Sequence, residues 1–230
     1  MVNPVSAPES SSTGRVERVV ERAIERRRAV AQDEIERLVG AAFTLIERTG
    51  NLEPKVSDIL AEAGLSNQAF YRHFRSKHEL LVAVLDEGIR GLADYLERRM
   101  STSPDPVSAI REWVRGMALQ AQDPNGARAS RPFALARGRL AEEFPAEVFE
   151  AQSTVTTPLE QVLERAKSSA PFESVDPAAD AETAYHLVMG WVQARLVESR
   201  IPDDAEVERL ETFVLGGLAR PVVESEEGGR

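Results

Sequence analysis

The sequence contains no cysteine, which excludes disulfide bonds and thiolate chemistry. Histidine is scarce as well, with three residues in 230. His73 and His78 are five positions apart, a spacing that does not place them on one helical face, so we predict no metal site. The sequence also lacks HExxH and GxSxG patterns and a phosphate-binding Gly-rich loop. We therefore predict no catalytic residues, no cofactor and no enzyme activity.

No apolar run approaches the length of about 20 residues that a membrane-spanning helix needs. The first residues, MVNPVSAPESSSTG, have no basic start followed by an apolar run, so they do not predict a secretory signal. The hydrophobic fraction of 42% and the charged fraction of 29% are typical of globular proteins. We expect a soluble cytoplasmic protein with no membrane partner.

Strand-like alternation does not persist anywhere, whereas helical spacing recurs through most of the chain, which predicts an all-α fold. One apolar stripe has this helical spacing: Ile35, Leu38, Val39, Ala42, Phe43 and Ile46. Arg48 in its last turn and Gly50 beyond it predict where this helix ends.

The chain before this stripe divides into two parts. Residues 1–14 are predicted as a flexible tail, and residues 15–31 as an Arg/Glu-rich leader helix. This leader ends in three consecutive cations, Arg26, Arg27 and Arg28. They form either a DNA-contacting arm or a solvated leader, and both interpretations stay open.

Two short helices follow the stripe. Gly64 ends the first, and Ser66 is a natural N-cap for the second. Ser76 and Glu79 predict a capping box that opens a long helix. Two short helices joined by a Gly-containing turn predict a helix-turn-helix, whose second helix enters the major groove of DNA.

Longer helices are expected after the break at residues 101–106. Their approximate bounds are 106–122, 127–140, 145–168, 178–199 and 204–219. Thr157 as N-cap, followed by Pro158, predicts a kink or a new start inside the third of them.

The negative charge is concentrated in the second part of the chain. The whole protein has a formal net charge of -10, but residues 1–101 hold 15 Lys+Arg against 16 Asp+Glu. Within GLSNQAFYRHFRSKHELL, which begins at Gly64, the first acidic residue is Glu79. The acidic total therefore does not argue against a nucleic-acid partner for the first half.

The second short helix has a polar face. At about 100° per residue, five side chains fall within an arc of roughly 140°. They are Asn67, Gln68, Tyr71, Arg72 and Arg75. Phe70 and Phe74 lie outside this arc, and we predict that they anchor the helix to its scaffold. Amide and guanidinium groups bond bidentately to adenine and guanine edges, and Lys77 begins the next helix, where a phosphate can bind.

VSDILAEAGLSNQAFYRHFRSKHELL resembles the DNA-binding domain of TetR-family transcriptional regulators, and the resemblance covers about residues 33–81. The family pattern has the form I-A-x-x-A-G-V-S-x-x-x-[LF]-Y-x-[HY]-F-x-[SN]-K-x-x-L. The matching positions are Ile59, Ala63, Gly64, Ser66, Phe70, Tyr71, His73, Phe74, Ser76, Lys77 and Leu80. Two positions depart from it: Lys55 stands where a capping Thr is usual, and Leu60 replaces a small Ala.

The resemblance implies particular DNA contacts. Base contacts are implied for Asn67, Gln68 and Arg72. Phosphate contacts are implied for Tyr71, His73, Lys77, Ser57 and, at the departing position, Lys55. His73 lies on the apolar side of the helix, so a packed histidine bonded to a main-chain group stays open as an alternative.

The resemblance also implies the overall organisation: a three-helix helix-turn-helix domain, then a helical bundle for ligand binding and dimerisation. The expected boundaries are a tail and leader helix (1–31), the DNA-binding domain (32–80), the effector-binding and dimerisation domain (81–222) and a disordered tail (223–230). The expected function is a regulator that binds a palindromic operator of double-stranded DNA as a homodimer. A small lipophilic or aromatic effector is expected to release it. The sequence does not separate repressor from activator, and a helical protein that docks a protein partner is the alternative.

Candidates in the second half are assigned more coarsely. The effector pocket is expected to include Trp113, Met117, Gln120, Phe133, Arg137, Phe149, Tyr185, His186 and Met189. An inward-turned Arg131 or Arg137 would favour an anionic effector. The dimer interface is expected to include Leu187, Trp191, Val207, Leu210, Val214 and Leu218, with burial inside the chain explaining part of this set.

Overall fold

The computed structural model describes residues 10–219, and within this range it contains helices and no strands, which confirms the all-α prediction. In chain order the helices are α1 (Ser10–Thr49), α2 (Val56–Ala63), α3 (Asn67–His73), α4 (Lys77–Ser101), α5 (Pro106–Gln122), α6 (Pro124–Leu135), α7 (Arg137–Glu143), α8 (Pro145–Ala166), α9 (Pro177–Glu198) and α10 (Asp204–Leu218). The tail predicted over residues 223–230 lies outside the described residues.

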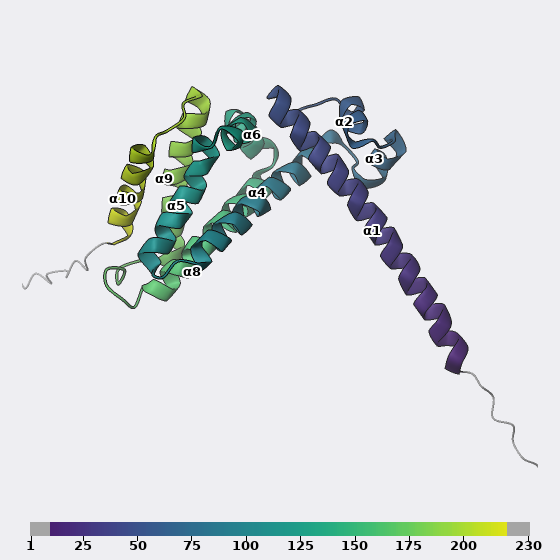
Figure 1. Cartoon of the computed structure of the whole chain (residues 1–230), viewed down its shortest axis with the longest axis horizontal. Coiled ribbons are helices and arrows are strands. Elements are labelled where there is room, and N and C mark those ends of the chain that lie inside the picture. Colours follow the sequence, from purple (N-terminus) through teal and green to yellow (C-terminus); the bar gives the residue numbers. More distant parts are fainter. Residues whose placement is uncertain (1–9, 220–230) are drawn as a thin grey trace, which may run out of the picture.

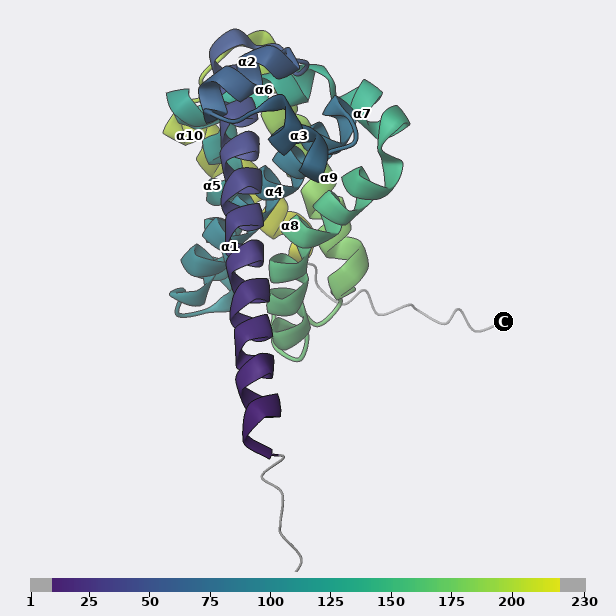
Figure 2. The ribbon, with the colours of Figure 1, turned by 90° about the vertical axis from the view of Figure 1, so that its right-hand side faces the viewer.

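Helix α1 is a single helix of 40 residues, where the sequence predicted a tail, a leader and a separate helix. Residues 10–14 are helical rather than part of a tail, and residues 1–9 lie outside the described range. No helix-breaking residue stands at residues 31–33, where the leader and the next helix were expected to separate. Side chains there bond to the following turn: Gln32 donates to Glu36, and Asp33 accepts from Arg37. The N-terminal part of α1 extends well past the other helices (Figures 1 and 2).

The C-terminal part of α1 packs as its apolar stripe predicted. Leu38, Val39, Ala42 and Ile46 are buried, and Ile35 and Phe43 are partly buried against the same cluster. The helix ends where expected, because Gly50 has a left-handed φ of 69° and donates its N–H to the Ile46 carbonyl.

Buried apolar side chains form two clusters. The smaller lies under α1, α2, α3 and the start of α4, and it includes Phe70 and Phe74. The larger fills the bundle of α4, α5, α8, α9 and α10 around Trp113. Figure 1 shows this bundle on one side and α1, α2 and α3 on the other, with α4 running between them. Helix α4 therefore belongs to both parts.

Two helix boundaries differ from the prediction. The helix expected at 127–140 is two helices, and the first begins earlier because Asp123 caps it and Pro124 occupies its first position. Helix α8 continues through Pro158, where a new start was one of the two expectations. Thr157 does not cap there, because its hydroxyl donates back to the Ser153 carbonyl at 2.7 Å.

Candidate nucleic-acid interface and internal cavity

The turn between α2 and α3 is fixed to α1 by one arginine. Gly64 ends α2 with a left-handed φ of 62°, which favours glycine. The Arg37 guanidinium donates to the Ala63 carbonyl at 2.7 Å and to the Gly64 carbonyl at 3.2 Å. Ser66 then caps α3 by accepting the Ala69 N–H, as predicted. The position of α3 on α1 therefore depends on named polar contacts as well as on packing.

Helix α3 has an anchored side and an exposed side. Phe70 and Phe74 are buried with ring centroids 5.9 Å apart, which confirms their predicted anchoring role. Asn67 and Gln68 are exposed, and Tyr71 exposes 60% of its surface. The three side chains predicted to meet DNA from this face are therefore accessible together.

Arg72 and His73 share a partner that the sequence analysis missed. The Arg72 Nη1 donates to both oxygens of the Glu34 carboxylate, at 3.0 and 2.9 Å, and the His73 Nε2 lies 2.6 Å from Glu34 Oε2. Hydrogen bonding to His73 first, and then the charge of Arg72, lowers the pKa of Glu34. Because 38 positions separate Glu34 from Arg72, no local pattern could have indicated this contact.

The predicted phosphate contact from His73 is wrong for this conformation. Its side chain exposes only 8% of its surface and is committed to Glu34. The open alternative of a packed histidine fits the structure, except that the partner is a carboxylate and not a main-chain group. His73 packs against α1 and is not available to a phosphate, because it lies on the side of α3 that faces α1.

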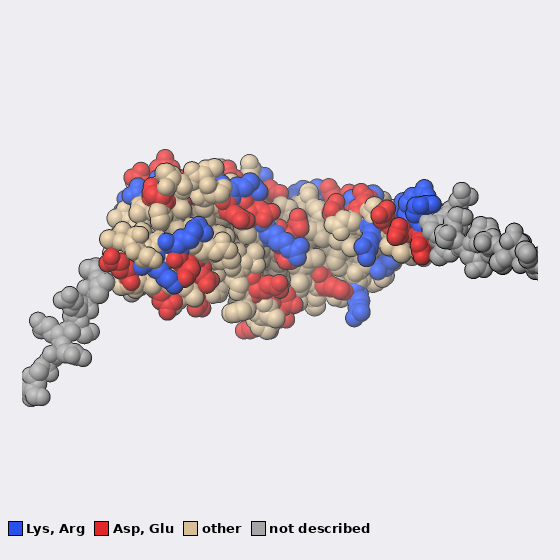
Figure 3. Space-filling model, turned by 90° about the horizontal axis from the view of Figure 1, so that it is seen from below, with Lys and Arg blue, Asp and Glu red and all other residues tan. Residues whose placement is uncertain are grey.

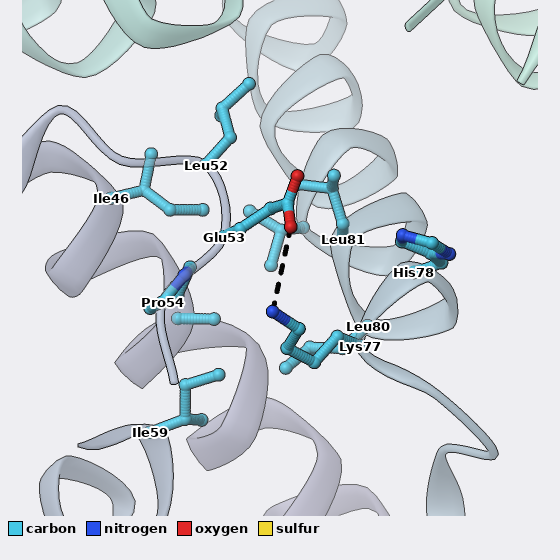
Figure 4. Close-up of a pocket in the computed structure, with 11 residues that line it drawn as sticks. Ile46, Leu52, Glu53, Pro54, Ile59, Lys77, His78, Leu80 and Leu81 are labelled. Atoms are coloured by element: carbon cyan, nitrogen blue, oxygen red, sulfur yellow. Dashed lines mark ion pairs between the residues drawn. The ribbon is translucent and has the colours of Figure 1, made fainter. Parts of the chain in front are cut away.

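The remaining phosphate candidates lie at two helix starts. Lys55 is exposed and does not cap α2, and the Ser57 hydroxyl donates to the Asp58 carboxylate at 3.1 Å. At the start of α4, Lys77 Nζ lies 3.7 Å from Glu53 Oε2 (Figure 4). This ion pair is long and its side chains are about two-fifths exposed, so a phosphate can compete for the lysine.

The predicted capping box at α4 forms only in part. Ser76 accepts the Glu79 N–H at 3.2 Å, as expected. The Glu79 carboxylate, however, accepts the N–H of Arg75 at 2.6 Å and not that of Ser76. The bond still holds the turn between α3 and α4 close to the start of α4.

Residues of seven helices line a cavity of about 320 Å³. Five predicted pocket residues line it: Gln120, Phe133, Arg137, Tyr185 and Met189. Further lining comes from residues that the sequence analysis did not propose, among them Phe43, Leu85, Ile89, Leu92 and Val148. The wall is predominantly apolar, as is usual for small-molecule sites.

Four predicted pocket residues do not line the cavity. Trp113 and Met117 are fully buried in the core of the bundle, where the Trp113 Nε1 donates to the Val155 carbonyl at 3.0 Å. Phe149 exposes 68% of its surface, and His186 is exposed beside Glu182. Helical spacing identified which face of α5 is apolar, but it could not separate core from cavity wall.

The cavity has one polar region. Arg137 Nη1 donates to the Gln193 Oε1 at 3.3 Å, and Gln193 in turn donates to the Ala134 carbonyl. Burial raises the pKa of the nearby Tyr185, partly offset by the charge of Arg137, so Tyr185 is a neutral hydroxyl at pH 7. Arg131 does not line the cavity and donates to the Leu196 carbonyl instead.

The cavity is also lined by residues of α1, on which α3 packs, and of α4, which follows α3 in the chain. Phe43 belongs to α1, and Val84 and Leu85 belong to α4. Two ion pairs join the same region: Arg128 of α6 with Glu47 of α1 at 3.1 Å, and Arg139 of α7 with Glu53 at 2.9 Å. A change in the cavity wall therefore has a direct structural route to α1.

All the predicted interface residues of α10 are buried inside their own chain. These four pack inward: Val207, Leu210, Val214 and Leu218. The reason is that this side of α10 packs against α5. The Arg115 Nε of α5 donates to the buried Glu211 carboxylate of α10 at 2.6 Å. Leu187 is exposed at 38%, whereas Trp191 is half-buried under the Arg195 guanidinium at 4.8 Å.

A different set of residues is exposed on α9 and α10. We call it the α9–α10 face: Leu187, Gly190, Phe213, Gly216 and Gly217. All five are exposed, and Phe213 exposes 69% of its surface, the largest value for a bulky apolar residue among the described residues. A Cβ added to any of these glycines would meet no atom within 4 Å.

Other kinds of site find no support within residues 10–219. No group of three or more acidic or histidine side chains there is placed to hold a metal ion, and no helix there is both long and apolar enough to cross a membrane. Seen from below, acidic and basic side chains are interspersed over the molecule (Figure 3).

A comparison with known protein families concerns the part of the chain that contains α3. Residues 38–84 match the family model described as bacterial regulatory proteins, tetR family. Residues 38–84 therefore form a TetR-type DNA-binding domain. The matched range contains α2, α3 and the start of α4, so the exposed face of α3 belongs to a TetR-type domain. Regulators of this family are not enzymes, in agreement with the sequence analysis.

Solved structures extend the similarity to the rest of the fold. A TetR-family regulator from Pectobacterium atrosepticum is 22% identical, with a TM-score of 0.66 over 84% of this chain and 98% of that one. FadR from Bacillus subtilis, in complex with stearoyl-CoA, is 17% identical, with a TM-score of 0.62 over 82% and 99%. RolR in complex with resorcinol is 16% identical, with a TM-score of 0.62 over 83% and 89%. No curated protein matches the sequence.

Proposed function

We propose that this protein is a cytoplasmic transcriptional repressor that binds a palindromic DNA operator as a homodimer and leaves it when a small molecule fills the cavity. The observation that carries the proposal is the exposed polar face of α3 within a TetR-type domain, seated on Phe70 and Phe74. Asn67, Gln68 and Arg72 contact base edges, and Tyr71, Lys77, Ser57 and Lys55 contact phosphates. A partner-docking protein would not need amide and guanidinium groups on this face.

The first test separates base contacts from phosphate contacts. Duplexes bound by the wild-type protein are selected from a random pool, and the selection is repeated with Gln68→Ala. We expect Gln68→Ala to lose about 1–3 kcal/mol of preference at particular base pairs. Lys77→Ala should weaken binding to all sequences and reduce the slope of affinity against salt by about one. If the wild-type protein showed no salt-dependent affinity for any duplex, that result would contradict a DNA-binding function.

The cavity favours an effector that is mostly apolar and carries one anionic group. Its wall is predominantly apolar, its polar lining residues are Gln120, Ser130, Arg137, Gln152, Tyr185 and Gln193, and Arg137 supplies the positive charge. The ligands named for the two similar structures, stearoyl-CoA and resorcinol, each combine an apolar part with a polar part, which supports an effector of mixed polarity. A series of aromatic and acyl carboxylates, each paired with its neutral methyl ester, tests it by release of labelled operator. Arg137→Gln should abolish the advantage of each acid over its ester.

Release follows from the position of the cavity against α1 and α4. A ligand that favours a different packing of Phe43, Val84 and Leu85 shifts the population toward conformers in which α3 has moved. Coupling of about 1–3 kcal/mol between effector and operator binding is typical of such systems. The measurement is operator affinity at rising effector concentration. An effector that binds without altering operator affinity would contradict this mechanism.

The α9–α10 face is the proposed dimer interface. To contact successive turns on one face of a duplex, two copies of α3 must lie about 34–36 Å apart. Each chain has one α3, so a second subunit is required. Phe213→Asp should convert the dimer to a monomer in analytical ultracentrifugation and weaken operator binding. Phe149→Asp is the matched control, because Phe149 is equally exposed, at 68% against 69%, but lies on α8. Equal effects of the two variants, or none, would contradict this interface.

A further inference from the structure

Glu34 is the residue of α1 that contacts the exposed side of α3. Its carboxylate is 14% exposed and accepts hydrogen bonds from two consecutive residues of α3, Arg72 and His73. A carboxylate only accepts hydrogen bonds, so His73 Nε2 carries the proton in this contact. Because the His73 side chain is almost buried, its contact fixes the position of the Glu34 carboxylate.

The contact leaves the other edge of the Arg72 guanidinium accessible. Only Nη1 bonds to Glu34, and within residues 10–219 Nε and Nη2 make no hydrogen bond. The Arg72 side chain remains 53% exposed. A guanidinium offers its donors in a fixed fork, and a bidentate contact to guanine O6 and N7 needs only two of them. Arg72 can therefore contact a guanine through Nε and Nη2 while Nη1 stays on Glu34.

The geometry points to Glu34 as a specificity-determining positioning residue, which orients Arg72 toward one guanine in each half of the operator while His73 holds the carboxylate. This inference rests on the proposed function, because it requires sequence-specific DNA binding by α3. A long, flexible arginine that is already held in one orientation loses less conformational entropy when it meets a base. The negative charge of Glu34 also disfavours contacts between Arg72 and DNA phosphates. The Glu34–Arg72 pair therefore lowers the affinity for DNA of any sequence and raises the discrimination between base pairs.

Selection from a randomised duplex pool, with the full-length protein, tests the inference position by position. Arg72→Ala first defines the base pair at which preference depends on Arg72. Glu34→Gln should lose about three- to tenfold of the preference at that same pair and keep the preferences that depend on Gln68. In the Arg72→Ala background, Glu34→Gln should change nothing further at that pair.

Glu36→Gln is the matched control. Glu36 lies two positions from Glu34 on α1 and carries the same charge, but its exposed carboxylate accepts a hydrogen bond from Gln32 of its own helix at 2.8 Å. Both variants raise the net charge by one, so both change general DNA affinity alike. Only Glu34→Gln should change the preference at the Arg72 position.

Several outcomes would overturn the inference. One is an unchanged profile for Glu34→Gln, and another is a loss spread evenly over all positions, as a merely destabilised domain would produce. If Glu34→Gln does not fold, Glu34→Asp replaces it: the shorter side chain keeps the negative charge but draws the carboxylate back from both Arg72 and His73, and it should lose preference at the same pair. A wild-type protein with no preferred site would instead refute the proposed function. A preference that survives both Glu34 variants refutes this inference alone.

Discussion

The candidate DNA contacts of the TetR-type domain all lie within residues 55–77, whereas the wall of the cavity comes from seven helices spread between Phe43 and Leu196. The first site is one face of a seven-residue helix and its flanking turns. The second exists only where helices distant in sequence approach one another. A site built on one short helix is encoded by local spacing, and a site built between helices is encoded by packing over the whole chain.

The two regions also have separate apolar cores, one around Phe70 and one around Trp113. Phe70 anchors α3 directly, whereas Trp113 supports the cavity only indirectly, because it lies in the core and not in the cavity wall. Helix α4 contributes to both cores, so the regions share a rigid element without sharing a site.

The largest expected effects come from removing one core residue in each region. Phe70→Ala and Trp113→Ala should each cost about 3–5 kcal/mol, and the second also leaves the Val155 carbonyl without its buried donor. Hydrogen exchange monitors the regions separately. We expect Phe70→Ala to lower protection chiefly in α2 and α3, and Trp113→Ala chiefly in α5 and α8. Equal loss throughout after either change would show one cooperative unit and break the comparison.

Filling the cavity should separate effector response from DNA binding. Met189→Trp places a larger side chain against the cavity wall, and we expect effector affinity to fall about tenfold or more while operator affinity stays within about twofold. Calorimetry with the effector and binding to labelled operator provide the two measurements. Phe149→Trp, on the exposed surface of α8 and away from both the cavity and the α9–α10 face, is the control for an added indole. A matching loss of operator affinity for Met189→Trp would mean that the cavity side chains also hold α3.

The attachment of the reading helix to α1 should cost less to break. Arg37→Ala removes the donor to the Ala63 and Gly64 carbonyls, and we expect a loss of about 1–2 kcal/mol in unfolding free energy. Arg48→Ala is the control, because Arg48 also joins α1 to α2, through Glu62 at 3.3 Å, but as an exposed ion pair. That control should cost about 0–1 kcal/mol. Equal effects in denaturant unfolding would show that the carbonyl contacts do not fix the turn.

The smallest expected effect lies in the helical body and depends on pH. A hydrogen bond from Arg200 is the main cause that lowers the pKa of Glu206 from 4.5 to about 2. A lowered folded-state pKa stabilises the fold above pH 4.5, and this contribution is lost as the pH falls toward 2. Wild type should therefore be slightly more stable than Glu206→Gln at pH 7, and thermal melts should show the difference shrinking across this window. A constant difference would exclude Glu206 ionisation as its source.

Local sequence determined the all-α class, the helix-turn-helix, the caps at Ser66 and Ser76, and the anchoring of α3 by Phe70 and Phe74. Each depends on residues within a few turns of one another, so periodicity and spacing sufficed. The same reasoning identified Gln120, Phe133, Arg137, Tyr185 and Met189 as candidates that do line the cavity.

Only the tertiary structure decided which apolar faces meet. Helical spacing shows that a face is apolar, but it does not show whether the neighbour is a core, a cavity or a second subunit. This is why Trp113 and Val214 proved to be core residues. It is also why Glu34 was missed: the physical basis of its role is a contact between side chains 38 and 39 positions apart, which exists only once α3 lies on α1.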